Sequence, residues 1–141
     1  MKVDGNCHCK KLKYKAEIDS NQISVCHCLD CQILSGSAFR TAVRIKKTQF
    51  RLTAGEPRSY TKLSDSGNPR IMVFCGDCGT QLYGTGIGDD SNTLSLRIGT
   101  CNQRAELKPI RQIWTRSRVS WLNNLGIEKC YETGPPPNVA N

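Results

Sequence analysis

Apolar and polar residues alternate with a period of two along much of the chain. Apolar side chains occupy every second position from Leu12 to Ile18, and Lys13, Lys15 and Glu17 stand between them. Successive side chains of a β-strand point to opposite faces, so this pattern predicts a strand with one buried face.

The segment Phe39–Lys46 also alternates and predicts a strand whose two faces differ. Phe39, Val43 and Ile45 would lie on one face, whereas Arg40 and Arg44 would lie on the other. Seven further segments have the composition of short strands: Ile23–Cys26, Phe50–Thr53, Arg58–Lys62, Arg70–Phe74, Gln81–Tyr83, Thr93–Ile98 and Gln112–Arg116. Clusters of Gly, Pro, Asn and Asp separate them, which predicts a mainly β, antiparallel fold.

Helical signals are few. The segment Asp30–Ser35 predicts one or two helical turns, and no sequence repeat is present. The chain has 141 residues, which is the size of one domain. We therefore predict a single domain over residues 1–133, followed by a flexible, proline-rich tail over residues 134–141.

Composition narrows the class of protein. Hydrophobic residues make up 38% of the chain, and none of its apolar runs approaches the ~18 residues of a membrane helix. The first ten residues lack the apolar region of a secretory signal peptide. These features predict a cytoplasmic protein without a membrane segment.

Nine cysteines are the strongest chemical signal. Seven of them fall in three short motifs, which are Cys7-His8-Cys9, Cys26-His27-Cys28-Leu29-Asp30-Cys31 and Cys75-Gly76-Asp77-Cys78. Clustered cysteines in a reducing compartment are typical of metal ligands rather than disulfides. C-x-x-C binds zinc from a tight turn, and C-x-C puts two sulfurs on one face of an extended segment. Gly76 and Gly79 suit a turn that needs positive φ.

Seven ligands divide into one set of four and one set of three. Cys26, Cys28 and Cys31 lie within six residues and can reach one zinc, which leaves Cys7 and Cys9 to pair with Cys75 and Cys78. Four thiolates close a structural zinc site, whereas three leave a position open for a ligand. The alternative is a zinc ribbon of Cys28, Cys31, Cys75 and Cys78, with the other three spare.

The remaining candidates have weaker signals. Cys101 and Cys130 have no clustered partner, so we expect them to be small buried residues. His8 and His27 each stand between two cysteines, and in a strand their side chains would point away from the neighbouring sulfurs. We expect neither to be a ligand, although His27 could act as a nearby acid or base.

The formal net charge of +8 favours an acidic partner, either nucleic acid or a small anion. The lysines and arginines form no run of four, and the aromatic residues are scattered. This pattern lacks the basic stripe and stacking platform of a nucleic-acid binder, so a nucleic-acid partner is disfavoured.

Together these motifs resemble the glutathione-dependent formaldehyde-activating enzyme family, which includes centromere protein V. The resemblance rests on Gly5-Asn6-Cys7-His8-Cys9, on the segment from Cys26 to Phe39 and on the segment from Phe74 to Gly79, and it extends over roughly residues 3–125. It implies the Mss4-like fold, a zinc-bound complex of antiparallel β-sheets. It also implies a structural zinc on Cys7, Cys9, Cys75 and Cys78 and a catalytic zinc on Cys26, Cys28 and Cys31.

The implied activity is that of a carbon–sulfur lyase. The open zinc would bind the thiol of glutathione, lower its pKa and deliver the thiolate to formaldehyde or a similar small electrophile. Arg40 is the first candidate for holding a glutathione carboxylate. The chain departs from the family pattern at Gly99-Thr100-Cys101-Asn102-Gln103, where family members often have G-x-L-D-[DN]. The alternative function is a zinc-stabilised binding module without catalysis, with nucleic acid or a protein as its partner.

Overall fold

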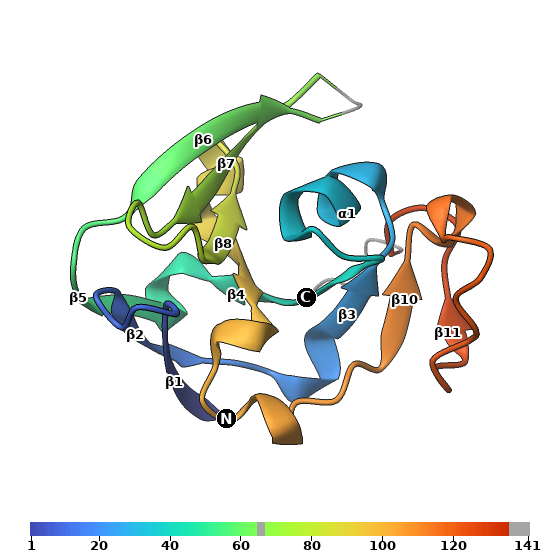
Figure 1. Cartoon of the computed structure of the whole chain (residues 1–141), viewed down its shortest axis with the longest axis horizontal. Helices are drawn as coiled ribbons and strands as arrows, with labels where there is room; N and C mark the ends of the chain where they lie inside the picture. The colour runs from blue at the N-terminus through green and yellow to red at the C-terminus, as the bar shows by residue number, and fades with distance from the viewer. Residues whose placement is uncertain (65–66, 136–141) are drawn as a thin grey trace.

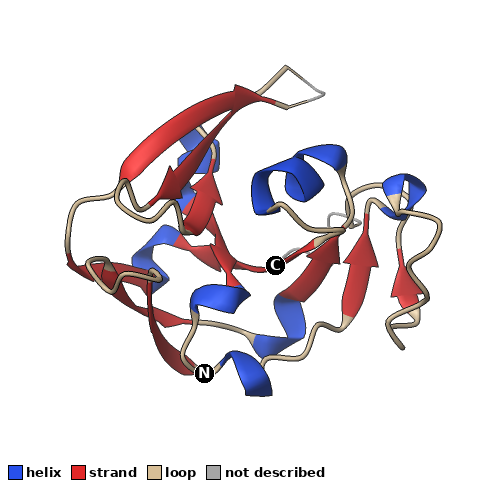
Figure 2. Cartoon of the chain, in the orientation of Figure 1, coloured by secondary structure: helices blue, strands red, loops and turns tan. Residues whose placement is uncertain are grey.

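Two β-sheets and one short α-helix make up most of the computed structural model, which describes residues 1–64 and 67–135 (Figures 1 and 2). The smaller sheet has three antiparallel strands in the order β1-β2-β5, namely β1 Lys2–Asn6, β2 Lys13–Glu17 and β5 Phe50–Ala54. The helix α1 spans Leu29–Ser35. Of the tail expected at residues 134–141, residues 136–141 lie outside the described residues.

The larger sheet has eight strands in the order β11-β10-β3-β4-β9-β8-β7-β6. Its strands are β3 Ile23–Cys26, β4 Arg40–Lys46, β6 Arg58–Leu63, β7 Pro69–Phe74, β8 Gln81–Thr85, β9 Thr93–Arg97, β10 Arg111–Ile113 and β11 Lys129–Cys130. Six short 3-10 turns connect the elements: Ser20–Gln22, Lys47–Gln49, Gly88–Asn92, Ile98–Thr100, Arg104–Glu106 and Thr115–Ser117.

The mainly β fold with few short helices is confirmed, but the sheet is not purely antiparallel. β10 runs parallel to both β3 and β11. A parallel pair needs a long crossover connection, and here most of the chain lies between β3 and β10. The β1 and β11 strands were not expected, because β1 has only one apolar residue after Met1 and β11 spans two residues.

The core lies between the smaller sheet and the middle of the larger one. Its members include Val3 of β1, Tyr14 of β2, Ile23 of β3, Val43 of β4 and Leu96 of β9. The alternation predicted for the first strand is present, since its buried residues are Tyr14 and Ala16. Burial of these side chains removes apolar surface from water and is the main favourable contribution to folding.

The β4 strand separates this core from a pocket. Val43 and Ile45 are buried in the core, as the alternation predicted. Arg40, Ala42 and Arg44 line the pocket on the other face. The larger sheet therefore has one face that stabilises the fold and another that is free to bind a ligand.

Candidate metal clusters and the arginine-lined pocket

The first cysteine cluster joins two segments that are far apart in the sequence. Cys7 and Cys9 follow β1, and Cys75 and Cys78 follow β7. Their four sulfurs all lie within 4.8 Å of one another, with 3.5 Å between Cys7 and Cys9 and 3.7 Å between Cys9 and Cys75. A disulfide bond would be ~2.05 Å long. Four sulfurs placed tetrahedrally at ~2.3 Å from zinc are ~3.8 Å apart, so this cluster fits zinc.

Backbone geometry holds each half of the four-cysteine cluster in a tight turn. Gly79 donates to the Cys75 carbonyl at 2.8 Å, and Lys10 donates to the Cys7 carbonyl at 2.9 Å. Gly79 has φ of 74°, so the prediction of positive φ is confirmed there but is wrong for Gly76. In the other turn Lys10 takes the left-handed conformation, with φ of 64°. Each half is therefore a preformed knuckle.

Two residues of the four-cysteine cluster are buried in the core. Cys7 is 0% exposed and Cys75 is 1% exposed, and both belong to the core cluster. The Leu12 backbone N–H donates to the Cys7 sulfur at 3.3 Å. The Thr80 hydroxyl lies 3.2 Å from the Cys78 sulfur, and its hydrogen bond lowers the pKa of Cys78 to about 5. Such hydrogen bonds favour the thiolate, which is the form that binds a metal.

The second cluster is local in sequence. Cys26 ends β3, Cys28 is the N-cap of α1 and Cys31 lies in the first turn of that helix. Their sulfurs lie within 4.8 Å of one another, and all three residues are half-buried. Hydrogen bonds from Cys26 and Cys31 lower the pKa of Cys28, and the backbone N–H of Cys31, 3.4 Å from the Cys28 sulfur, adds to this effect. Three converging thiols form a donor set that suits a soft metal such as zinc.

The structure therefore brings the seven motif cysteines together as four plus three. Cys28 and Cys31 group with Cys26, and not with Cys75 and Cys78, so the alternative zinc-ribbon grouping is wrong. Neither histidine belongs to a cluster formed by the described residues. His27 is 0% exposed, and its Nε2 lies 2.8 Å from the Gln112 side-chain oxygen.

The two remaining cysteines differ from each other. Cys101 is 0% exposed and its sulfur lies 3.2 Å from the Tyr14 hydroxyl, so the prediction of a buried residue is confirmed. The same prediction is wrong for Cys130, which is exposed because β11 lies at the edge of the larger sheet. At the departure from the family pattern, the Asn102 and Gln103 side chains both donate to the Asp4 carboxylate.

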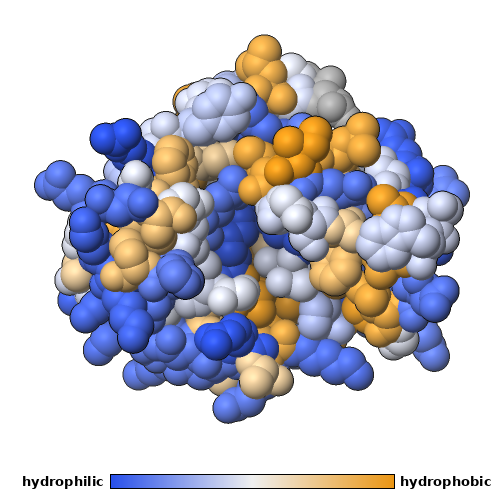
Figure 3. Space-filling model, in the orientation of Figure 1, coloured by the Kyte–Doolittle hydropathy of each residue, from blue (hydrophilic) through white to orange (hydrophobic). Residues whose placement is uncertain are grey.

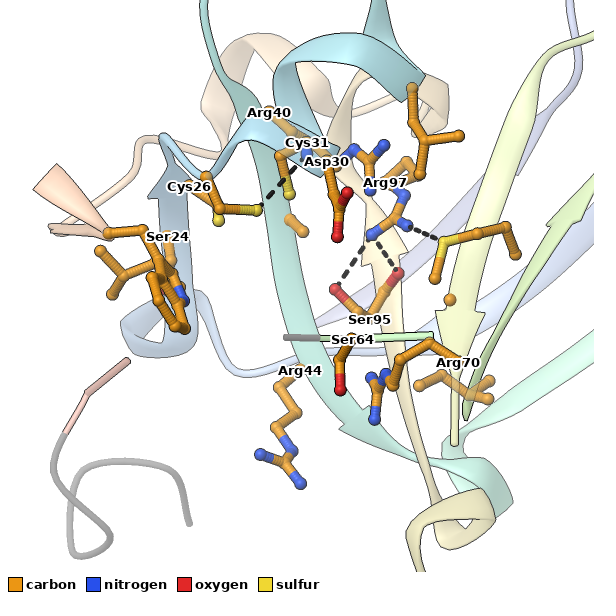
Figure 4. Close-up of a pocket in the computed structure, with 18 of the residues that line it drawn as sticks. Ser24, Cys26, Asp30, Cys31, Arg40, Arg44, Ser64, Arg70, Ser95 and Arg97 are labelled. Atoms are coloured by element: carbon orange, nitrogen blue, oxygen red, sulfur yellow. Dashed lines mark hydrogen bonds between the residues drawn. The ribbon is translucent and has the colours of Figure 1, made fainter. Parts of the chain in front are cut away.

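A pocket of about 550 Å³ opens beside the three-cysteine cluster (Figure 4). Strand pairing explains its floor, because small residues of neighbouring strands face each other there: Ser24 opposite Ala42, and Gly84 opposite Ser95. Six cationic side chains surround this floor: Arg40, Arg44, Lys62, Arg70, Arg97 and Arg111. Of the described residues that line the pocket, the one carboxylate is Asp30, which forms an ion pair with Lys62.

Arg40 lines the pocket, as its strand face predicted. It is 8% exposed, and its guanidinium donates to the Gln81 side-chain oxygen at 3.1 Å. No local motif marks Arg70, Arg97 and Arg111 as pocket residues, because they come from three other strands. Among the described residues that line the pocket, six cations and one paired carboxylate produce a positive potential that attracts anions.

The surface around the pocket is mixed. Hydrophobic atoms gather over α1, where Leu29 and Ile33 are exposed, and hydrophilic surface lies in the hollow next to them (Figure 3). None of the helices in the described ranges is both long and apolar enough to cross a membrane.

Fold and site together define a mainly β protein with two cysteine clusters that suit zinc, one of them beside a cationic pocket. The chain belongs to the family of glutathione-dependent formaldehyde-activating enzymes, which it matches over residues 2–117. The family resemblance of the cysteine motifs is therefore confirmed.

Similar proteins include a curated relative and a solved structure. A curated Schizosaccharomyces pombe protein, named as an uncharacterized lyase, is 34% identical over 80 residues, which is 57% of this chain. The match spans 55% of that relative, or about half its length. A crystal structure of a Rhodobacter sphaeroides protein shares the fold with a TM-score of 0.56, covering 91% of this chain and 98% of that one at 14% identity.

Proposed function

We propose that this protein is a zinc-dependent enzyme of the carbon–sulfur lyase type. It binds a thiol such as glutathione at the three-cysteine cluster and adds it to formaldehyde or a similar small electrophile. The observation that carries this proposal is the inequality of the two clusters. Four cysteines form a complete set, with Cys7 and Cys75 buried in the core, whereas three lie beside a 550 Å³ pocket that is rich in cations.

Each cluster would hold one zinc ion. Cys7, Cys9, Cys75 and Cys78 would complete a tetrahedral, structural site, and Cys26, Cys28 and Cys31 would leave one position for a ligand. Zinc bound to the three cysteines would lower the pKa of a thiol that coordinates it, and would so make a thiolate available at neutral pH. The proposal is supported by the family to which the chain belongs and by the lyase name of its S. pombe relative.

The residues of the pocket would bind and orient the thiol. Arg40 and the neighbouring cations attract the carboxylates of glutathione, which brings its sulfur toward Cys26, Cys28 and Cys31. In the net reaction, the sulfur adds to the carbonyl carbon of the electrophile. The C=O double bond becomes a single bond, and the proton from the thiol ends on the oxygen. The addition therefore needs no other reactant.

The competing function, a zinc-stabilised binding module, receives less support. Arg40, Arg97 and Arg111 are each less than a tenth exposed, so they lie too deep to contact the backbone of a nucleic acid. We also propose a cytoplasmic location, because free thiols persist in a reducing compartment.

Calorimetry on zinc-loaded protein tests this function. Glutathione should bind with at least ~10-fold higher affinity than S-methylglutathione, because a thioether has no proton to lose and is a poor zinc ligand. With formaldehyde present, the protein should also accelerate formation of the adduct above the rate in a matched protein-free solution. Equal binding of the two compounds would contradict sulfur ligation and favour the binding module.

A further inference from the structure

Arg97, the last residue of β9, is buried and forms no ion pair with a carboxylate of the described residues. Its side chain is 7% exposed. Nη1 donates to the carbonyl and the hydroxyl of Ser95, both at 3.1 Å, and Nη2 donates to the Met72 sulfur at 3.4 Å. Nε is buried and has no hydrogen-bond partner among the described residues, and no ion pair within those residues includes Arg97.

Burial of an unpaired cation opposes folding, because the charge loses its hydration without gaining a counter-charge. Desolvation and then the neighbouring Arg40 lower the pKa of Arg97 to about 9, and the opposing effect of Cys31 and Cys26 does not cancel this shift. A thioether sulfur is only a weak acceptor and does not compensate for this loss. A residue that destabilises the ligand-free protein at this position indicates that a ligand supplies the missing charge.

The sheet register places Arg97 at the centre of the cationic pocket. Arg97 pairs with Ala42, so on the same face of β4 its diagonal neighbours are Arg40 and Arg44. Figure 4 shows Arg97 between the cysteine end of the pocket, marked by Cys26 and Cys31, and the end that holds Arg44 and Arg70.

Gly84 of β8 allows the Arg97 and Met72 side chains to pack closely against the strand, because it has no Cβ. A Cβ on Gly84 would lie 3.0 Å from Nη2 of Arg97 and 3.1 Å from the terminal methyl of Met72. In a guanidinium, Nε–H and one N–H of Nη2 lie along the same edge. In Arg97 this is the edge that lacks a strong acceptor. Two parallel N–H groups match the two oxygens of a carboxylate.

We propose that Arg97, together with Arg40, forms a carboxylate-binding subsite between the three-cysteine cluster and the Arg44–Arg70 end of the pocket. This proposal rests on the proposed function only for the identity of the molecule that carries the carboxylate. The source is either the thiol substrate itself or an aldehyde that carries a carboxylate next to its carbonyl group. Formaldehyde has no charge and does not explain a buried arginine.

The first test compares two thiols. Glutathione has carboxylates, and N-acetylcysteamine is an uncharged thiol. By calorimetry on zinc-loaded protein, Arg97→Gln should weaken glutathione binding by ~10–100-fold, the range for a charged hydrogen bond. Binding of N-acetylcysteamine should change by less than ~2-fold on the same scale. The matched control is Arg51→Gln, an exposed arginine of β5 outside the pocket, which should change neither affinity.

The second test identifies the source of the carboxylate. With N-acetylcysteamine as the thiol, adduct formation is measured with glyoxylate and with formaldehyde. If the electrophile fills the subsite, the KM for glyoxylate rises in Arg97→Gln and the KM for formaldehyde does not. A loss in either the glutathione arm or the glyoxylate arm supports the subsite. If neither arm shows a selective loss, the subsite proposal is overturned.

Failure of the proposed function is distinguishable from failure of the subsite. S-methylglutathione keeps both carboxylates but has no thiol, so weaker binding of this probe to Arg97→Gln supports the subsite even if no thiol binds through sulfur. Arg97→Met should raise the midpoint of thermal unfolding of the ligand-free protein, because it removes an unpaired buried charge. A lower midpoint with unchanged binding of S-methylglutathione would show a structural role and overturn the proposal.

A second variant keeps the test valid if substitutions of Arg97 prevent folding. Gly84→Ala retains Arg97 but adds a methyl group in tight contact with Nη2, which forces the guanidinium to shift from its position. It should weaken binding of S-methylglutathione and leave the affinity for N-acetylcysteamine unchanged. Equal effects on both compounds would contradict a carboxylate subsite.

Discussion

The two cysteine clusters use the same side chain in opposite environments. The four-cysteine cluster joins segments that are 66 or more residues apart, and two of its members are buried in the core. The three-cysteine cluster lies within one short segment at the junction of β3 and α1, and its members are half-buried beside a pocket. The first cluster therefore fixes the positions of distant strands, whereas the second adds little to chain closure.

Stability and ligand binding are therefore assigned to different parts of this protein. Closing a long loop restricts the unfolded chain more than closing a short one, so a metal in the four-cysteine cluster contributes more to folding. The pocket beside the other cluster holds a buried, unpaired arginine, which opposes folding. Groups that favour the fold and groups that favour a ligand thus lie on opposite faces of β4.

Substitution of one cysteine in each cluster should produce the greatest difference in the free energy of unfolding. Cys75→Ser should lower the free energy of unfolding by more than ~5 kcal/mol, because the domain loses most of the folding energy of its structural metal. Cys28→Ser should lower it by less than ~1.5 kcal/mol and leave a folded protein with altered thiol binding. Chemical denaturation of zinc-loaded protein measures both. Comparable losses would show that the three-cysteine cluster is structural too.

Metal removal tests the same comparison without mutation. A fully loaded preparation should contain two zinc ions per chain, and a mild chelator should remove one faster than the other. The fast phase should belong to the three-cysteine cluster, because it has fewer ligands and lies beside the pocket. Cys28→Ser should abolish that phase when release is followed with a zinc indicator. One zinc per chain at full loading would exclude the two-site arrangement.

The smallest expected effect comes from a cysteine outside both clusters. Cys101 is as buried as Cys7, and its sulfur contacts the Tyr14 hydroxyl. Cys101→Ala should cost about 1–2 kcal/mol through the lost packing and hydrogen bond, with no change in zinc content. A loss as large as that of Cys75→Ser would mean that burial, rather than metal binding, explains the importance of the four-cysteine cluster.

The strands that the sequence predicted are those in which alternation is strong. Tyr14 and Ala16 of β2 show this alternation clearly. The sequence of β1 does not, because one of its inward positions is Gly5, which packs against Tyr14. A Cβ on Gly5 would lie only 2.3 Å from the Tyr14 hydroxyl oxygen. The last predicted strand, Gln112–Arg116, is shorter in the structure. It ends at Ile113 because Trp114 takes a left-handed conformation with φ of 58°.

Motif spacing identified the seven ligand cysteines, and strand alternation identified the face on which Arg40 lies, whereas the folded structure selected the four-plus-three grouping over the zinc ribbon. Motif spacing and strand alternation act over a few residues, so they can be read directly. Only the tertiary structure decided which other cations join Arg40. Arg70, Arg97 and Arg111 reach the pocket through the pairing order of five strands and a parallel β3–β10 contact. That order depends on the packing of the whole core, because no local pattern specifies which distant strands become neighbours.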